Sequence, residues 1–183
     1  MLKIVEFISR NKDNQGLIDF KPRTRTLIVT DKNVHHVDDE FKAFVAQGVY
    51  NETSRMYETF NELDPVGANR ALAHFLIDNP DAQPYKVESV LKSELVKHTT
   101  TKHWLFDVDM QVRTKDEVVA FINDLSDNAV IDVRDTKSGY AVVTEHGFDV
   151  RALTERYPDI EVKRTNGLLY VTSQTEVWSA WNR

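Results

Sequence analysis

The stretch that decides the fold reads Thr101-Lys-His-Trp-Leu-Phe-Asp-Val-Asp-Met110. Alternate residues of a β-strand share one face of a sheet. A strand over 103–110 therefore directs one set of side chains into a core, namely Trp104, Phe106, Val108 and Met110. The other set, which points away from that core, contains His103, Leu105, Asp107 and Asp109.

Asp107 and Asp109 are unusual in such a strand, because aspartate is a poor strand former. Residues that break a local preference are expected at functional sites more than elsewhere. Their carboxylates are oxygen donors of the kind that bind Mg²⁺ or Mn²⁺. The pair therefore predicts a divalent-metal site, and the alternative is a solvated strand end that binds nothing.

The sequence after this strand alternates between helix and strand signals. Val118, Ile122 and Leu125 recur at helical spacing after a capping-box pattern, Thr114-Lys-Asp-Glu117. The further expected elements are strands over 129–134 and 140–144 joined by Asp135-Thr-Lys-Ser-Gly139, a helix over 148–157, and strands over 160–164 and 168–172 around an Asn-Gly hairpin turn. This order predicts a ferredoxin-like (RRM-like) βαββαβ module, in which two helices cover one face of an antiparallel sheet and the other face stays open.

The sequence pattern over residues 1–97 predicts an N-terminal lobe of strands and helices. Its expected strands cover 2–8, 25–30 and 55–60, and its expected helices cover 34–45, 65–79 and 86–97. Asp64 followed by Pro65 is a typical helix start. The polar run 97–102 separates this lobe from the module over 98–183, so we expect an α+β protein of two parts.

Composition excludes several classes of protein. The 183-residue chain has a formal net charge of −6, which disfavours a protein that coats nucleic acid through many basic side chains. It contains no cysteine, so disulfides and thiolate metal sites are excluded. No window approaches the roughly 18 consecutive apolar residues of a membrane span, and the charged first residues do not form a signal peptide. We therefore expect a cytoplasmic protein that makes no membrane contact.

Several residues are candidates to join the two aspartates. Glu161 and Lys163 alternate outward on the expected strand 160–164, either as part of a metal or phosphate site or as a cross-strand ion pair. The turn residues Lys137 and Ser138, followed by Gly139 and Tyr140, form a candidate phosphate-binding turn. Arg55, on an expected N-terminal strand, is a candidate to supply positive charge at one side of the site.

The element Trp104-Leu-Phe-Asp-Val-Asp109, followed by Thr136-Lys-Ser-Gly-Tyr-Ala-Val-Val143, resembles the first two motifs of the archaeo-eukaryotic primase (primase-polymerase) superfamily. The resemblance implies a nucleotidyltransferase with Mg²⁺ or Mn²⁺ on Asp107 and Asp109, Glu161 as a third acid, and a nucleotide or nucleic acid as ligand. The layout also resembles small phage-encoded proteins of primase-like type. Where the family has a histidine after the Ser-Gly turn, this chain has Tyr140 and Ala141, so the imidazole would have to come from His103 or His146.

Two other functions stay open. A non-enzymatic binding protein on the same scaffold, acting on a host protein or a nucleotide signal, fits the missing histidine. Leu105-Phe-Asp-Val-Asp-Met-Gln-Val112 is also similar to the first motif of haloacid dehalogenase-like phosphatases. That family usually has Gly-Thr after the second aspartate, and its parallel sheet disagrees with the hairpin-rich order after residue 128.

Overall fold

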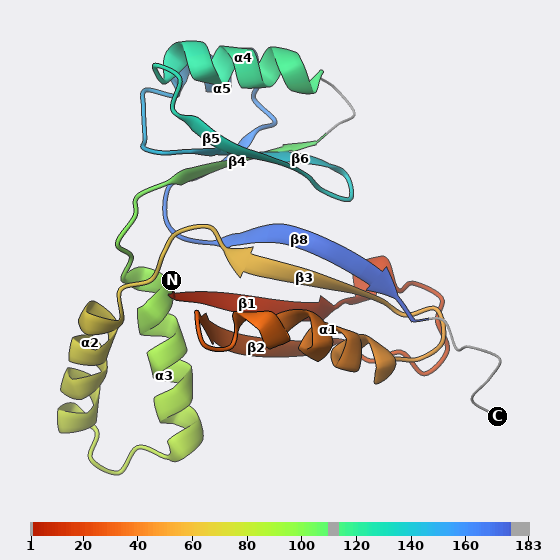
Figure 1. Cartoon of the computed structure of the whole chain (residues 1–183), viewed down its shortest axis with the longest axis vertical. Helices are drawn as coiled ribbons and strands as arrows, with labels where there is room; N and C mark the ends of the chain where they lie inside the picture. Colours follow the sequence, from red (N-terminus) through yellow and green to blue (C-terminus); the bar gives the residue numbers. More distant parts are fainter. Residues whose placement is uncertain (1, 110–113, 177–183) are drawn as a thin grey trace. The chain divides into compact units, whose positions relative to one another are not determined.

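The structure is a computed structural model that describes residues 2–109 and 114–176 (Figure 1). The described residues form two four-stranded sheets and five α-helices, which confirms the predicted α+β class. The chain divides into two compact units. The first contains the residues up to Glu58 and those from Leu169 onward, and the second runs from Thr59 to Leu168. This division differs from the predicted one, which placed a single boundary between residues 97 and 98.

The first unit contains a sheet with the strand order β2-β1-β3-β8 and a helix on one of its faces. Its elements are β1 (Leu2–Ser9), β2 (Arg23–Thr30), α1 (Val37–Ala46), β3 (Thr53–Thr59) and β8 (Leu168–Thr175), with short 3-10 helices at Asn11–Asp13 and Val34–His36. Phe7 of β1 joins the sheet to α1, because its ring centroid lies 5.1 Å from that of Phe41 and 5.7 Å from that of Phe44.

The strand β8 does not belong to the sheet that the sequence predicts for it. We expected it to pair with the strand before it across the Asn-Gly turn, but it pairs with β3 instead. Two backbone hydrogen bonds of 2.8 Å extend this pairing, from Asn51 N to Glu176 O and from Glu176 N to Glu52 O. The favoured two-residue turns of a hairpin need positive φ, and neither Asn166 nor Gly167 has it. The hairpin prediction is therefore wrong.

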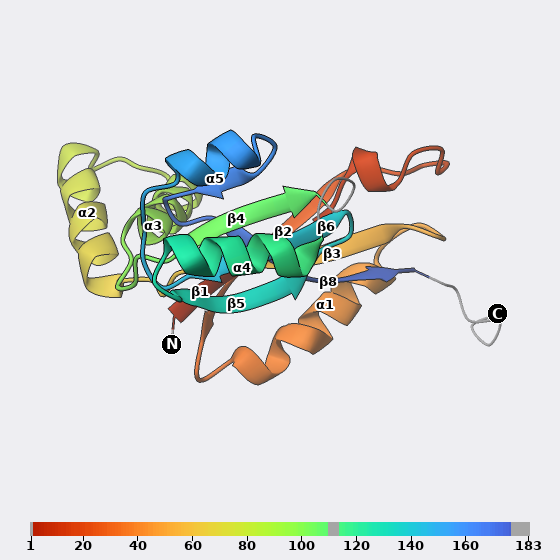
Figure 2. The ribbon, with the colours of Figure 1, turned by 90° about the horizontal axis from the view of Figure 1, so that it is seen from above.

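The second unit contains an antiparallel sheet with the strand order β5-β6-β4-β7. Its elements are α2 (Pro65–Asp78), α3 (Pro84–Lys97), β4 (Trp104–Asp109), α4 (Lys115–Leu125), β5 (Val130–Asp135), β6 (Gly139–Thr144), α5 (Arg151–Arg156) and β7 (Glu161–Lys163). Both α4 and α5 lie on the same face of this sheet (Figures 1 and 2). The opposite face is called the helix-free face below.

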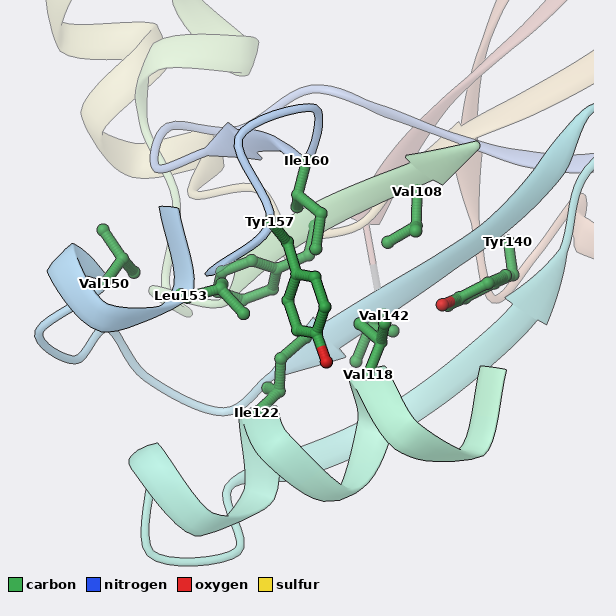
Figure 3. Close-up of a cluster of buried hydrophobic side chains, with 10 residues drawn as sticks. Val108, Val118, Ile122, Tyr140, Val142, Val150, Leu153, Tyr157 and Ile160 are labelled. Atoms are coloured by element: carbon green, nitrogen blue, oxygen red, sulfur yellow. The ribbon is translucent and has the colours of Figure 1, made fainter. Parts of the chain in front are cut away.

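The core of the second unit fills the space between its sheet and the two helices (Figure 3). Phe106 and Val108 of β4 are buried there against Val118 and Ile122 of α4 and Leu153 of α5. Burying a large apolar side chain contributes about 1.5–3 kcal/mol. This burial fixes the orientation of β4, because every second residue of the strand is held in the core. Met110, which the sequence places in the same set, lies outside the described residues.

The helices α2 and α3 form an antiparallel hairpin whose ends meet before β4 (Figure 1). Asp64 accepts a hydrogen bond of 2.9 Å from Val66 N, and Pro65 occupies the first helical position, which confirms the predicted helix start. The hairpin is closed by a bridge between Leu63 and Thr99. The predicted capping box of α4 is absent, because the Thr114 side chain makes no capping bond. No helix in the described part of the chain has the length and apolar character needed to cross a membrane.

Candidate functional site

Asp107 and Asp109 lie on the helix-free face, since the intervening core residues of β4 point to the helices. The strand register shows their neighbours. Asp107 is opposite Ala141 of β6 on one side and Glu161 of β7 on the other, while Asp109 is opposite Gly139. Asp109 is exposed, and the side chain of Asp107 retains 44% of its accessible surface. Three carboxylates therefore share one accessible part of the face.

Lys163 lies between two of these acids. Its Nζ is 3.4 Å from Oδ2 of Asp107 and 3.6 Å from Oε2 of Glu161. The sequence left open whether Glu161 and Lys163 form an ion pair or bind a ligand, and the ion pair is present. Partly exposed pairs of this kind contribute about 0–1 kcal/mol to stability. The contacts therefore lower the local negative charge without fixing the geometry strongly.

The turn between β5 and β6 lies at the Asp109 end of the face. It is closed by a hydrogen bond of 2.8 Å from Thr136 N to Gly139 O, as the sequence predicts for a hairpin. Lys137 and Ser138 are exposed at its tip. Gly139 is needed where it stands, because a Cβ atom there would lie 1.9 Å from the Val108 carbonyl oxygen. The glycine lets the turn approach the backbone of β4 beside Asp109.

Replacing Gly139 with alanine tests this close approach. We expect the substitution to lower the free energy of unfolding by about 1–3 kcal/mol, because the added methyl group would overlap backbone atoms of Val108 and Asp109, which would have to shift. Chemical unfolding followed by circular dichroism measures the effect. The neighbouring Ser138→Ala is the control, with a change within about 0.5 kcal/mol. Equal stabilities of the two variants would show that the backbone contact is not required.

Of the other predicted site residues, Tyr140 is not on this face and Arg55 belongs to the other unit. Tyr140 is fully buried in the core on the helix side, where Figure 3 shows it near Val142, and burial raises the pKa of its phenol. Arg55 belongs to the first unit and is also buried, with its guanidinium paired to the carboxylate of Asp13 and donating a hydrogen bond of 3.4 Å to Tyr57 Oη. Neither side chain is therefore assigned to a site with the aspartates.

The two histidines that the sequence offers as substitutes lie at the other end of β4. His103 precedes the strand and its Nδ1 is 3.0 Å from the carbonyl oxygen of Glu145, and His146 is the next residue along. At about 3.3 Å per strand residue, the backbone of His103 is about 13 Å from that of Asp107 and about 20 Å from that of Asp109. No imidazole from this end of the strand reaches the acid pair.

The sequence alone did not point to two further charged residues on the helix-free face. Arg134 of β5 is opposite Ala141, and Asp132 is opposite Val143, so both side chains share the face with Asp107. They contact each other, with Arg134 Nε 2.6 Å from Asp132 Oδ2. The alternation between apolar and charged residues in Val130–Asp135 indicates that Asp132 and Arg134 share a face away from the core.

The helix-free face is apolar at its centre and charged at its margin. Leu105, Ala141 and Val143 lie at the centre, around the register pair Leu105–Val143. The charged side chains lie at the polar margin, which comprises the acidic end of β4, the β5–β6 turn and β7.

The donor set at this margin fits a hydrated divalent cation that also contacts a ligand. Within the described ranges 2–109 and 114–176, no group of three or more His, Asp or Glu side chains is placed to hold a metal ion by itself. Mg²⁺ in phosphate-transfer sites is commonly bound through one or two carboxylates, several waters and the phosphates of the substrate. Asp107 and Asp109 supply the two carboxylates that such a site requires, whereas a site built only from protein ligands would need more.

Comparison of the chain with protein-family models, with curated proteins and with solved structures finds no match.

Proposed function

We propose that the second unit binds the phosphate of a nucleotide or polynucleotide, together with Mg²⁺ or Mn²⁺ held by Asp107 and Asp109. The observation that carries the proposal is the placement of these two carboxylates on the accessible margin of the helix-free face, one opposite Glu161 and the other beside the Ser138-Gly139 turn. Acid pairs and phosphate-binding turns are complementary, because a divalent cation bridges carboxylate and phosphate oxygens.

The arrangement of elements supports a ferredoxin-like module. From β4 to β7 the chain runs strand, helix, strand, strand, helix, strand, and the sheet order read from its other edge is β7-β4-β6-β5. Two helices on one face and antiparallel pairing throughout complete the pattern. A module of this kind is what the resemblance to primase-polymerase proteins implies, and in such a module the acid pair would lie on the helix-free face.

Four residues of the margin have roles in this proposal. Asp107 and Asp109 hold the cation, and Lys163 and Lys137 supply positive charge to the phosphate. A bound cation of this kind neutralises charge on a phosphoryl group and lowers the pKa of an attacking hydroxyl, which is the chemistry of a nucleotidyltransferase. Because neither His103 nor His146 reaches the acid pair, the function that fits best is binding of the phosphate ligand without extension of a chain.

Thermal unfolding with and without ligand tests this function. Mn²⁺ together with a nucleoside triphosphate is expected to raise the midpoint of unfolding, since a ligand that binds only the folded state adds about 2.7 kcal/mol at one hundred times its Kd. Asp107→Ala should abolish the shift. Asp124→Ala, which removes an exposed carboxylate from α4 on the opposite side of the sheet, should retain it.

Two results would count against the function. One is a chain whose unfolding midpoint is unchanged by Mn²⁺ with each of the four ribonucleoside and four deoxyribonucleoside triphosphates. The other is a shift of equal size in the wild type and in Asp107→Ala, because the ligand would then bind elsewhere.

A second candidate function, binding of a partner protein, is favoured by the surface of the α2–α3 hairpin. Val66, Ile77 and Tyr85 are 65–76% exposed, and of the residues in the two helices only Ala68 and Leu95 are buried. Val66 and Ile77 are eleven residues apart, so they share one side of α2. Under this function, the double variant Val66→Ser with Ile77→Ser should no longer be cross-linked to the partner. The rise in unfolding midpoint caused by Mn²⁺ and nucleotide should be unchanged.

A further inference from the structure

A pocket of about 410 Å³ lies in the second unit, between the end of α3, the segment that leads into β4 and the segment after β7. Three of the residues that line it are cationic, namely Lys97, Lys102 and Arg164, and no carboxylate lines it. Pockets for small molecules commonly measure about 300–1,000 Å³. In a chain with a net charge of −6, this is a local concentration of positive charge.

The walls of the pocket are fixed by two asparagines that line it. Asn61 Oδ1 accepts hydrogen bonds of 2.8 Å from Thr101 Oγ1 and from His103 N. Asn166 Oδ1 accepts one of 3.2 Å from Asn61 N, and Asn166 Nδ2 donates one of 3.4 Å to the Val96 carbonyl oxygen. These bonds connect three separate parts of the chain around the pocket. A site held in this way loses little freedom when it takes up a ligand.

Two of the three cations have no acidic partner among the described residues. The Arg164 guanidinium lies over the Trp104 ring, 5.2 Å from its centroid, which orients the side chain without neutralising it. Lys102 Nζ is 3.5 Å from Thr99 Oγ1, a neutral group. Lys97 differs from both, because its Nζ is 2.7 Å from Oε1 of Glu94. Arg164 and Lys102 therefore supply the positive charge available to a ligand.

The end of α3 opposes anion binding, but by less than these cations favour it. The C-terminus of a helix is equivalent to about half a negative charge. Asn166 satisfies one of the terminal carbonyl groups, that of Val96. Two full positive charges on Arg164 and Lys102 exceed this partial charge, so the potential in the pocket remains positive.

We propose that this pocket binds a phosphate-bearing small molecule of mononucleotide size. Arg164 and Lys102 would contact the phosphate, and the hydroxyl groups of Thr99 and Thr165, which also line the pocket, would donate to its remaining oxygens. Arginine suits this ligand, because its planar guanidinium donates two parallel hydrogen bonds to phosphate oxygens. The pocket shares no residue with the acid pair and needs no metal, so the inference goes beyond the proposed function and is independent of it.

Titration of the full chain in EDTA tests the pocket alone, because divalent metal is removed and the acid pair cannot contribute. The probes are inorganic phosphate, adenosine monophosphate and adenosine, and calorimetry measures the binding of each. Adenosine monophosphate should bind saturably, inorganic phosphate more weakly, and adenosine not at all. Binding should weaken with salt, as expected of a partly exposed charged contact.

Variants locate the site. Arg164→Ala and Lys102→Ala should each weaken binding of adenosine monophosphate about tenfold or more, the loss expected for a charge-assisted hydrogen bond. Arg164→Lys should restore part of it. Arg70→Ala, which removes an exposed cation from α2, and Asp107→Ala should bind as the wild type does. Circular dichroism confirms that each variant is folded before it is titrated.

Three outcomes would overturn the proposal. They are no saturable binding of either phosphate probe, equal binding by adenosine and its monophosphate, and unchanged affinity in folded Arg164→Ala and Lys102→Ala. Binding in EDTA that is lost in Asp107→Ala and kept in both pocket variants would likewise show that the ligand does not bind in the pocket.

Discussion

Replacing Phe106 with alanine should lower the free energy of unfolding of the second unit by about 3–5 kcal/mol, the usual cost of deleting a buried aromatic ring. Phe106 is 0% exposed and its ring centroid is 5.4 Å from that of Phe148. The side chain sits at the centre of β4, so its loss removes contacts to the sheet and to both helices. Chemical unfolding monitored by circular dichroism measures the change.

Ile131→Ala is the matched control for this substitution. Ile131 lies on β5 of the same sheet but is 51% exposed, so its truncation should change stability by no more than about 0.5 kcal/mol. If Phe106→Ala unfolded at the same denaturant concentration as the control, the orientation of β4 would be wrong. The aspartates would then not lie on the face that the proposed function requires.

Replacing Arg23 with methionine should destabilise the first unit by about 3–5 kcal/mol, because a buried carboxylate loses its partner. The Glu52 side chain is 2% exposed and accepts a hydrogen bond of 2.9 Å from Arg23 Nε and another of 2.9 Å from Val49 N. Arg25→Met is the control, since Arg25 forms an ion pair with Glu40 in which each side chain is about 40% exposed. Such an exposed pair contributes about 0–1 kcal/mol.

The same pair predicts how stability depends on pH. Burial acts to raise the pKa of Glu52, but the hydrogen bonds from Arg23 and Val49 outweigh it and leave the pKa below its ordinary value of 4.5. A carboxyl group with a lowered pKa in the folded state stabilises the fold above that ordinary value and loses the contribution as the pH falls through the lowered pKa. Stability in the wild type should therefore decrease below about pH 4.5.

Arg23→Met should reverse the sign of this dependence. Without the guanidinium, burial raises the pKa of Glu52 above its value in the unfolded chain, so acidification neutralises a destabilising charge. The difference in stability between wild type and variant should narrow as the pH falls from 7 to 4. A difference that stays constant over this range would mean that Glu52 is not the group left unpaired.

The parts of the fold that sequence predicts well are those with local signals. The alternation in 103–110 predicts which side chains of β4 enter the core, and Asp64 with Pro65 marks the start of α2. The hairpin over Asp135–Gly139 forms as its turn residues indicate. In each case the signal lies within a few residues of the structure that it specifies, and no distant part of the chain competes with it.

Pairing between distant strands could not be predicted in this way. The Asn166-Gly167 sequence is typical of a tight hairpin, yet the Asn166 side chain bonds to the backbone of Asn61 and β8 pairs with β3. The local β-strand propensity of a segment does not determine which other strand it pairs with. For the same reason the sequence assigned β8 to the wrong sheet and placed the boundary between units at residue 97, whereas α2 and α3 belong with β4.

The candidate site was predictable in part. Strand alternation places Asp107, Glu161 and Lys163 on one face, and the structure brings the three side chains into contact. The prediction that Tyr140 belongs to the site rests on its neighbours in the turn, whereas strand alternation places its side chain on the core side, where it is fully buried. The pocket with Arg164 could not be foreseen, because its walls come from three separate parts of the chain.

Nuclear magnetic resonance with Mn²⁺ tests the central claim most directly, because the paramagnetic ion broadens only resonances close to its binding site. In the presence of a nucleoside triphosphate, we predict that substoichiometric Mn²⁺ broadens the backbone amides of Asp107, Asp109, Ser138 and Gly139 first. Asp107→Asn with Asp109→Asn should abolish that selective broadening. Broadening centred on another part of the chain, or uniform broadening that the double variant does not change, would contradict a metal-dependent phosphate site on this face.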